Sequence, residues 1–171
     1  MDDYRGNSLL NVVIIIIFLF GFSFLLNFFW EALHAVYLYQ HHDFDAATYV
    51  PMLLYVSSMD SLMVLGFYLG VGLMWRDLLW IKRFQKKSIV VFLILGIVVA
   101  FIIEYRAVIY THRWLYKEAM PTIFGVGLSP LVQLSVTGIL AVWLTKEILY
   151  GKGLLRRPIL ISEPKFDVGN K

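Results

Sequence analysis

The chain contains no cysteine and has little charge. Without cysteine it has no disulfide, no thiolate nucleophile and no thiolate metal ligand, which excludes disulfide redox chemistry. Only 16% of its 171 residues are charged and 60% are hydrophobic, whereas soluble proteins are about a quarter charged and about half apolar. The hydrophobic residues form long blocks, a pattern typical of a membrane protein.

The hydrophobic blocks predict the fold class and the domain organisation. Each block exceeds the roughly 20 residues that a helix needs to cross the hydrocarbon core, and the blocks lie at about 9–39, 49–75, 88–110 and 122–149. We therefore expect an all-α polytopic membrane protein, a four-helix transmembrane bundle over residues 1–150. Pro130 predicts that the fourth helix starts late or kinks near Ser129. Residues 151–171 predict a polar tail without a fold of its own.

Basic residues are distributed unevenly between the two ends of these helices. Twelve lie at the N-terminus, in residues 76–87 and from residue 146 onward, whereas Arg113 and Lys117 alone lie on the opposite side. Because basic loops face the cytoplasm, we expect both termini to be cytoplasmic. In residues 75–84, large apolar residues alternate with basic ones, which predicts a segment at the membrane surface or an ordinary interfacial girdle. No cleavage site follows the first block, so we expect it to be retained.

A polar stripe runs along the second half of the first block. Ser23, Asn27, Glu31 and His34 are spaced i, i+4, i+8 and i+11, which places them on one helix face. Every other block has such a stripe: Ser57, Asp60 and Ser61 in the second, Glu104, Thr111 and His112 in the third, and Ser129, Gln133 and Thr137 in the fourth. Ionisable residues inside a membrane are costly and normally face a functional bundle interior.

The depths of these residues predict one shared site. Glu31 and Glu104 lie near the ends of blocks that run outward, and Asp60 and Gln133 lie in the early halves of blocks that return. The four histidines fall on the same side, so we expect a site that opens away from the cytoplasm; they are His34, His41, His42 and His112. The alternative for the uncharged residues is that they only hold the helices together by hydrogen bonds. By contrast, Gly66 and Gly70 predict a close-packing helix face.

The types of side chain suggest roles within this site. Glu31 and Glu104 are candidates for a proton donor and acceptor, with Asp60 or His34 tuning or relaying. The candidates for ligand binding are Asn27, Trp30, His112, Trp114, Tyr116, Ser129 and Gln133. Trp30, Trp114 and Tyr116 would wall an apolar substrate.

A metal site is weighed against these roles and is not expected. Glu31 and His34 have the E-x-x-H spacing of di-iron bundles, and residues 41–45 read HHDFD. The second E-x-x-H is missing, because Ala107 stands three residues after Glu104. Nothing in the sequence identifies a cofactor.

Three short motifs carry a resemblance to a known group. They are N-x-x-W-E at residues 27–31, W-x-Y-x-x-x-M-P at residues 114–121 and G-L-S-P-L-x-Q at residues 127–133. The chain resembles a family of small prokaryotic four-helix integral membrane proteins, which implies the same topology and a prokaryotic plasma membrane but supplies no function. In layout alone it is similar to the EXPERA group, which includes sterol isomerases.

The function expected from these features is the binding, or the transformation, of a lipid-like or isoprenoid molecule at the extracytoplasmic side of the bundle. A proton- or ion-coupled transporter and a structural or assembly subunit remain alternatives, so the sequence leaves open whether the protein is an enzyme. The partners expected are membrane lipids and an apolar small molecule, with a second copy or another membrane protein left open. Nothing points to nucleic acid.

Overall fold

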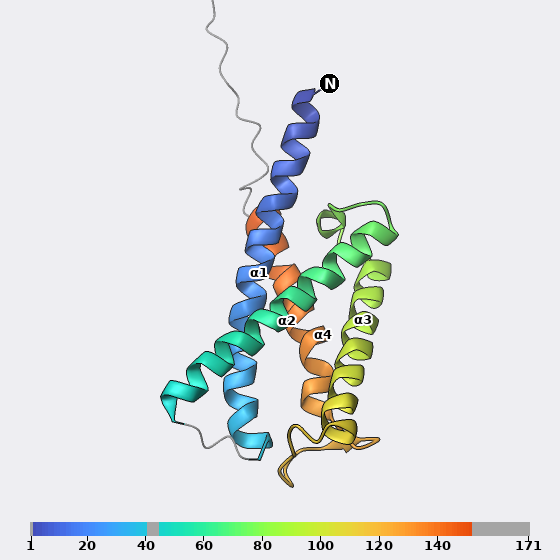
Figure 1. The fold of residues 1–171 in the computed structure, drawn as a ribbon. Coiled ribbons are helices and arrows are strands. Elements are labelled where there is room, and N and C mark those ends of the chain that lie inside the picture. The colour runs from blue at the N-terminus through green and yellow to red at the C-terminus, as the bar shows by residue number, and fades with distance from the viewer. Residues whose placement is uncertain (1, 41–44, 152–171) are drawn as a thin grey trace, which may run out of the picture.

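A computed structural model describes residues 2–40 and 45–151 of the chain, with side chains from residue 9 (Figure 1). It is an all-α bundle of α1 (Asp2–Leu38), α2 (Ala46–Met74), α3 (Lys86–Tyr105) and α4 (Leu128–Lys146). Short π-helical turns extend α3 (η2, Arg106–Tyr110) and α4 (η3, Glu147–Gly151). All four helices are long and apolar enough to cross a membrane, as the sequence predicts. Residues 41–44, which include two of the histidines, and the tail from 152 lie outside the described part.

The helix ends follow from local signals, with one correction to the predicted bounds. α2 begins at Ala46 because the Asp45 side chain accepts a hydrogen bond from the Thr48 N–H at 3.0 Å and caps the helix. The fourth helix begins at Leu128 rather than near residue 122, so its predicted late start is confirmed. Pro130 then lies in the first turn, where its missing N–H costs nothing.

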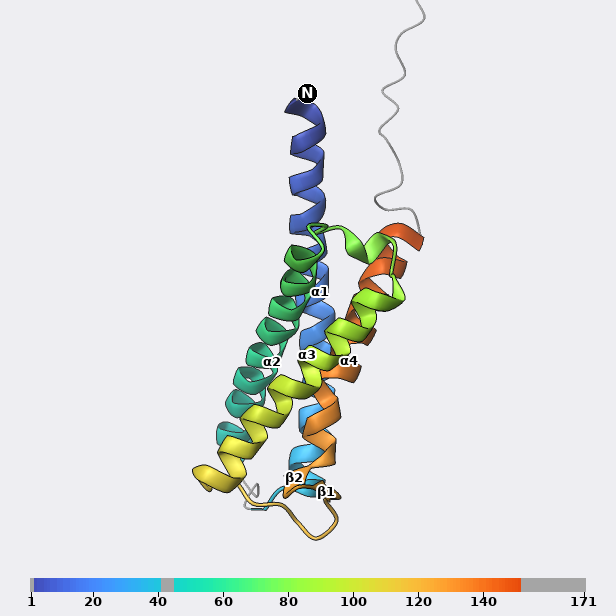
Figure 2. The ribbon, with the colours of Figure 1, turned by 90° about the vertical axis from the view of Figure 1, so that its right-hand side faces the viewer.

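The residues before α4 form a small hairpin in place of the predicted helix start. β1 (Thr122–Ile123) pairs antiparallel with β2 (Val126–Gly127). Gly125 lies in the turn with a φ of +78°, a conformation that a side chain disfavours. This hairpin closes the same end of the bundle as the end of α3 (Figure 2).

The connections alternate between the two ends of the bundle. The first turn of α1, the α2–α3 connection and the end of α4 lie at one end, and the hairpin and the start of α2 lie at the other (Figures 1 and 2). The described basic residues of the α2–α3 connection therefore share one end with the last turn of α4. We call this the basic end and the other the hairpin end.

The α2–α3 connection is not simply a surface segment. A 3₁₀ turn, η1 (Trp80–Lys82), inserts Trp80 and Ile81 into the core at 3% and 0% exposure. The Trp80 Nε1 donates to the Tyr68 carbonyl at 3.1 Å, and the Tyr68 hydroxyl donates to the Leu78 carbonyl at 2.5 Å. The basic residues around them, such as Arg83, remain exposed.

The half of the bundle nearer the basic end is packed with apolar side chains. Residues from all four helices are fully buried there, among them Ile15, Leu19, Val64, Phe92 and Val142. α3 and α4 approach closely at two glycines: a Cβ on Gly96 would lie 2.4 Å from the Ser135 Oγ, and one on Gly138 would lie 2.8 Å from the Phe92 ring. Gly66 and Gly70 have nothing within 4 Å of such a Cβ, so the close contact predicted at that face is not made by residues 2–40 and 45–151.

Candidate functional site

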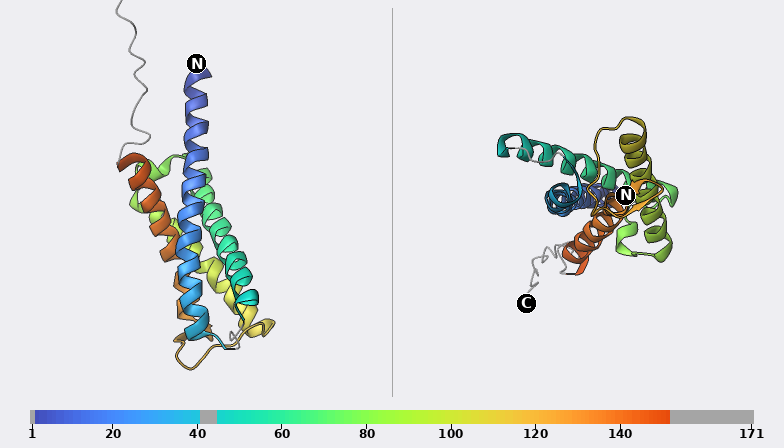
Figure 3. Two further views of the ribbon diagram at one scale, coloured as in Figure 1. Left: turned by 90° about the vertical axis from the view of Figure 1, so that its left-hand side faces the viewer. Right: turned by 90° about the horizontal axis from the view of Figure 1, so that it is seen from below.

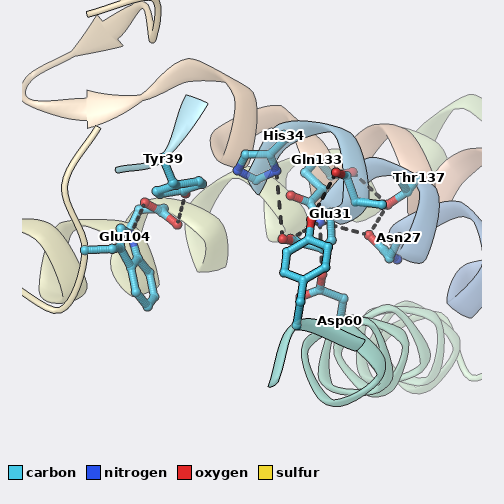
Figure 4. A network of polar contacts seen from close by, with 11 residues as sticks. Asn27, Glu31, His34, Tyr39, Asp60, Glu104, Gln133 and Thr137 are labelled. Atoms are coloured by element: carbon cyan, nitrogen blue, oxygen red, sulfur yellow. Dashed lines mark hydrogen bonds and ion pairs between the residues drawn. The ribbon is translucent and has the colours of Figure 1, made fainter. Parts of the chain in front are cut away.

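A hydrogen-bonded network joins α1, α2 and α4 in the half of the bundle nearer the hairpin end. The Gln133 Nε2 of α4 lies 2.7 Å from the Glu31 Oε1 of α1 and 3.0 Å from the Asp60 Oδ2 of α2. The same nitrogen lies 3.3 Å from the Asn27 Oδ1, which also accepts from the Thr137 hydroxyl at 2.9 Å (Figure 4). One side-chain amide therefore bridges two carboxyl groups that come from different helices.

The positions of these side chains follow from their helical spacing. Ile15, Leu19, Ser23 and Asn27 recur every four residues on α1 and are all fully buried, so one face continues from apolar core to polar network. The Asn27 Nδ2 donates to the Ser23 carbonyl at 2.9 Å, which turns the Asn27 oxygen toward α4. The side-chain amide of Gln133 has two N–H groups, and they donate in its two shorter contacts, to the carboxyl groups of Glu31 and Asp60.

Glu104 of α3 stands in a separate group made of hydrogen-bond donors. The Tyr39 hydroxyl donates to its Oε1 at 3.1 Å, and the Trp114 indole N–H donates to its Oε2 at 3.2 Å. The Tyr116 hydroxyl donates to Oε2 as well. Three donors and no acceptor around a carboxyl group stabilise its anionic form. We call Tyr39, Trp114, Tyr116 and Glu104 the Glu104 group.

The Glu104 group is held by segments outside the long helices. Residues 38–40 pair with residues 115–117, with the Gln40 N–H donating to the Leu115 carbonyl and the Lys117 N–H to the Leu38 carbonyl, both at 2.9 Å. The Gly127 N–H donates to the Tyr116 oxygen at 3.0 Å. A Cβ on Gly127 would lie 3.0 Å from the Tyr116 ring, so glycine allows the hairpin to seat this tyrosine.

The two tyrosines of this group stay protonated. Burial, followed by the bond to Glu104, raises the pKa of the Tyr116 hydroxyl well above its ordinary value. Burial and the neighbouring negative charge of Glu104 raise the pKa of the Tyr39 hydroxyl further still. Both hydroxyls are therefore donors under all ordinary conditions, which fixes the direction of their bonds to Glu104.

His34 connects the Glu104 group with the Glu31–Gln133–Asp60 network. Its Nδ1 lies 4.0 Å from the Glu31 Oε2, and its ring centroid lies 4.7 Å from that of Tyr39. Figure 4 shows His34 between Glu31 on one side and Tyr39 with Glu104 on the other. The imidazole is 6% exposed, so it belongs to the interior of the site.

A cavity of about 370 Å³ adjoins both groups. Eight of its lining residues carry polar groups. Seven face the interior, namely Glu31, His34, Tyr39, Asp60, Glu104, Trp114 and Gln133, and the eighth, Tyr55, faces outward. The rest is apolar, from Ala35, Met52, Val56, Met63, Ala100, Ile103, Pro130 and Leu134. Tyr55 of α2 and Ile103 of α3, which are 64% and 40% exposed, form its rim.

The rim lies where two helices diverge. α2 and α3 are joined by a short connection at the basic end and separate toward the hairpin end (Figures 1 and 3). Because the exposed lining residues Tyr55 and Ile103 come from these two helices, the cavity opens between α2 and α3, and the three carboxyl groups line its interior. In a bilayer such an opening would face the acyl chains.

The structure brings together most, but not all, of the residues selected from the sequence. All four catalytic candidates line the cavity, as do Trp114 and Gln133, whereas Asn27 and Tyr116 stand behind it in the two hydrogen-bonded groups. The other three ligand-binding candidates neither line the cavity nor belong to these two groups. Trp30 is partly buried with its indole nitrogen unpaired among the described residues, Ser129 lies in the first turn of α4, and His112 is exposed with a φ of +46°.

Sequence reasoning also missed residues that the structure places at the site. The sequence pattern places Tyr39 only at the end of the first helix, although in the structure it donates to Glu104 and lines the cavity. Met52, Val56 and Met63 supply the apolar wall from α2. Their i, i+4 and i+11 spacing is a signal for one helix face, but hydrophobic residues recur on every face of this helix, so the signal cannot be separated from the background.

Within residues 2–40 and 45–151, no group of three or more His, Asp or Glu side chains is arranged to hold a metal ion. Most of the HHDFD stretch, residues 41–44, lies outside the described residues, so it is not included in this statement.

Comparisons of the chain with protein-family models, with curated proteins and with solved structures gave no match. The two resemblances of the sequence therefore stay predictions.

Proposed function

We propose that the chain is an integral membrane protein, with both termini in the cytoplasm, that binds a lipid-like or isoprenoid molecule in the cavity beside Glu31, Asp60 and Glu104. In this orientation the basic end faces the cytoplasm, in keeping with the distribution of lysine and arginine. The cavity then lies in the extracytoplasmic half of the bilayer. A prokaryotic plasma membrane is the proposed location.

The observation that carries this proposal is the contrast between the walls and the floor of the cavity. Eight of its lining residues are aliphatic, methionine or proline, and it is about 370 Å³ in volume, within the range of small-molecule sites. Its floor holds three carboxyl groups, which are expensive at this depth unless they have a role. Apolar walls suit a hydrocarbon, and the lateral opening between α2 and α3 lets such a molecule enter from the bilayer.

The surroundings of Glu104 and those of the Glu31–Asp60 pair suit different tasks. Glu104 accepts from three donors, so its carboxyl group is held in place and orients Tyr39 and Trp114. Glu31 and Asp60 both accept from the Gln133 nitrogen, at 2.7 Å and 3.0 Å, and two carboxyl groups held by one buried amide are better stabilised when one of them is protonated than as two anions. We therefore assign proton exchange with the bound molecule to Glu31 and Asp60, with His34 as the neighbouring relay.

This division changes the roles proposed from the sequence, where Glu31 and Glu104 formed the acid and base. The hydrogen bonds of Glu104 to Tyr39, Trp114 and Tyr116 favour a positioning role, because a proton on Glu104 would oppose one of those donors. A transporter remains the alternative, since paired acids also suit proton coupling. The filled apolar half at Ile15, Leu19 and Phe92 favours a one-sided binding site over a path across the bundle.

The proposal is tested by identifying what copurifies with the protein. The full chain is purified in mild detergent, and small molecules are extracted and identified by mass spectrometry. Val56→Trp narrows the cavity from its apolar wall, and Leu62→Trp on the exposed face of the same helix is the matched control. We expect a defined lipid or isoprenoid with the wild type and with Leu62→Trp, and its loss from Val56→Trp.

A second pair of variants separates binding from chemistry. Glu31→Gln and Asp60→Asn keep the shapes of the side chains and remove the acids. If the protein is an enzyme, both variants should keep the bound molecule but no longer convert it, and their helical content by circular dichroism should stay unchanged. If the wild type and Val56→Trp both carry only bulk lipid, the binding proposal is wrong and a structural subunit becomes the better description.

A further inference from the structure

A second cavity adjoins the first and is lined by two arginines. Its volume is about 360 Å³, and its lining consists of Ile103, Arg106, Ala107, Thr111, Arg113 and Trp114. Ile103 and Trp114 also line the cavity described above, so these two residues separate the two spaces. One space has apolar walls and acid groups, and the other has two positive charges and a hydroxyl group.

A local irregularity of the backbone brings the two arginines together. α3 ends in the π-helical turn η2, from Arg106 to Tyr110, and π-turns in helices are frequent at functional sites. The chain then reverses at His112, whose φ is +46°, and the Arg113 N–H donates to the Ala107 carbonyl at 2.8 Å. Arg113 is therefore held beside the turn that starts at Arg106, which a regular helix would not allow.

Neither arginine is neutralised within the described residues. The ion pairs found there are His34–Glu31 and Lys146–Glu147. Glu104 is the nearest acid in the sequence to Arg106, but its oxygens accept from Tyr39, Trp114 and Tyr116. Two arginines that line one cavity without a counter-ion make it positive, and a phosphate group offsets that charge by accepting hydrogen bonds from both guanidinium groups.

The depth of Arg106 and Arg113 in the proposed membrane also supports a phosphate group as their ligand. Arg106 begins the last turn of the apolar span Lys86–Tyr110 at the hairpin end, close to where a bilayer would present its interfacial region. The exposed Tyr110 and Phe124, at 75% and 86%, are at the same end of the chain's fold and suit that interface. An amphiphile with its chain in the first cavity would thus have its head at the level of the arginines.

We propose that the molecule bound by this protein is an amphiphile with a phosphate group, and that Arg106 and Arg113 hold the phosphate in the second cavity while the apolar chain lies in the first. This inference rests on the proposed function and narrows it to one class of ligand. Thr111 also lines the phosphate site, but its hydroxyl donates to the Arg106 and Ala107 carbonyls at 3.1 and 3.2 Å, so the two arginines supply the charge that binds the phosphate. Trp114 lines both cavities and so lies between head and chain.

The test compares two probes that differ only in the head group. Farnesyl phosphate and farnesol are titrated into the full chain in nanodiscs of zwitterionic lipid, with empty nanodiscs subtracted, and binding is followed by tryptophan fluorescence. The variant is Arg106→Gln/Arg113→Gln. Lys86→Gln/Lys87→Gln removes two charges from exposed positions at the other end of α3 and is the matched control. Both arginines are exposed, so their replacement should leave the fold intact, which circular dichroism checks.

We expect the wild type and the lysine variant to bind farnesyl phosphate about tenfold or more tightly than farnesol, since charge-assisted hydrogen bonds are lost with the alcohol. The arginine variant should bind both probes equally, at the affinity of farnesol. Equal affinities in the wild type, or an unchanged preference in the arginine variant, would overturn the phosphate site while leaving the apolar cavity in place.

Two further outcomes separate this inference from the proposed function. If neither probe binds the wild type, the apolar cavity itself is not a binding site and both proposals are wrong. If farnesol binds and Val56→Trp abolishes its binding, the apolar cavity stands whatever the arginines do. Inorganic phosphate is added as a competitor, and competition at concentrations comparable with those of farnesyl phosphate would assign the site to free phosphate and overturn the amphiphile.

Discussion

Removing the amide of Gln133 should destabilise the bundle through both carboxyl groups that it bridges. Gln133→Leu keeps a side chain of similar volume but deletes the donor that lies 2.7 Å from the Glu31 Oε1 and 3.0 Å from the Asp60 Oδ2. Hydrogen bonds between membrane helices contribute about 0.6 kcal/mol on average and up to about 1.7 kcal/mol each. Two such bonds correspond to roughly 1–3 kcal/mol, and we expect the upper end because the stranded carboxyl groups lose their partner in a dry site.

The assay is reversible unfolding in mixed micelles by increasing denaturing detergent, followed by circular dichroism. Thr145→Val is the matched control, because Thr145 is equally buried in α4 but its hydroxyl donates only to the Ala141 carbonyl of its own helix, at 2.7 Å. We expect the control to change the free energy of unfolding by less than about 0.5 kcal/mol, since only an intrahelical bond is lost.

A double-mutant cycle then isolates the interaction between α2 and α4. Asp60→Leu and Gln133→Leu together should cost about 0.5–3 kcal/mol less than the sum of the single changes, the range for residues in direct contact. If the two changes are additive, or if Gln133→Leu is as stable as the Thr145→Val control, Gln133 does not bridge the helices and the reasoning about the network is wrong.

Two predictions concern other parts of the fold. Gly138→Ala should destabilise the bundle by about 1–3 kcal/mol through overpacking, because the new methyl group would meet the Phe92 ring at 2.8 Å. Gly70→Ala, whose methyl group would have nothing within 4 Å, should instead stabilise its helix by up to about 1 kcal/mol. Thermal unfolding of the two variants measures the difference. At the start of α2, hydrogen bonds from Thr48 lower the pKa of the Asp45 carboxyl group, so its capping contribution is present at neutral pH and is lost as the pH falls through that lowered pKa. The Thr48 amide resonance should move with this titration by NMR, and an amide shift that does not change would contradict the cap.

The helices themselves could be predicted from the sequence because their signals are local. Hydrophobic blocks longer than a bilayer crossing give four helices, and a proline near the start of the last block gives its late beginning at Leu128. Helical periodicity also places Asn27 and Glu31 on one face of α1, and Gln133 and Thr137 on one face of α4. The structure pairs these two faces.

The division of the acids into two groups could not be read from the sequence. Glu31, Asp60 and Glu104 are alike in the sequence as acids within apolar blocks, and only their neighbours in the fold distinguish them. Glu104 receives donors from residues 39, 114 and 116, which lie outside the predicted helix interiors and meet through the pairing of residues 38–40 with 115–117. No periodicity describes such segments, because their course depends on tertiary contacts.

The sequence alone determined that this protein has four long apolar helices and which faces of them are polar, since both depend on residue type and on the fixed geometry of a helix. The tertiary structure alone decided which polar faces meet, how α2 and α3 separate to leave a cavity, and how the π-turn after Tyr105 brings Arg106 and Arg113 together. These features depend on helix tilt and on irregular connections, which are set by contacts between residues far apart in the chain.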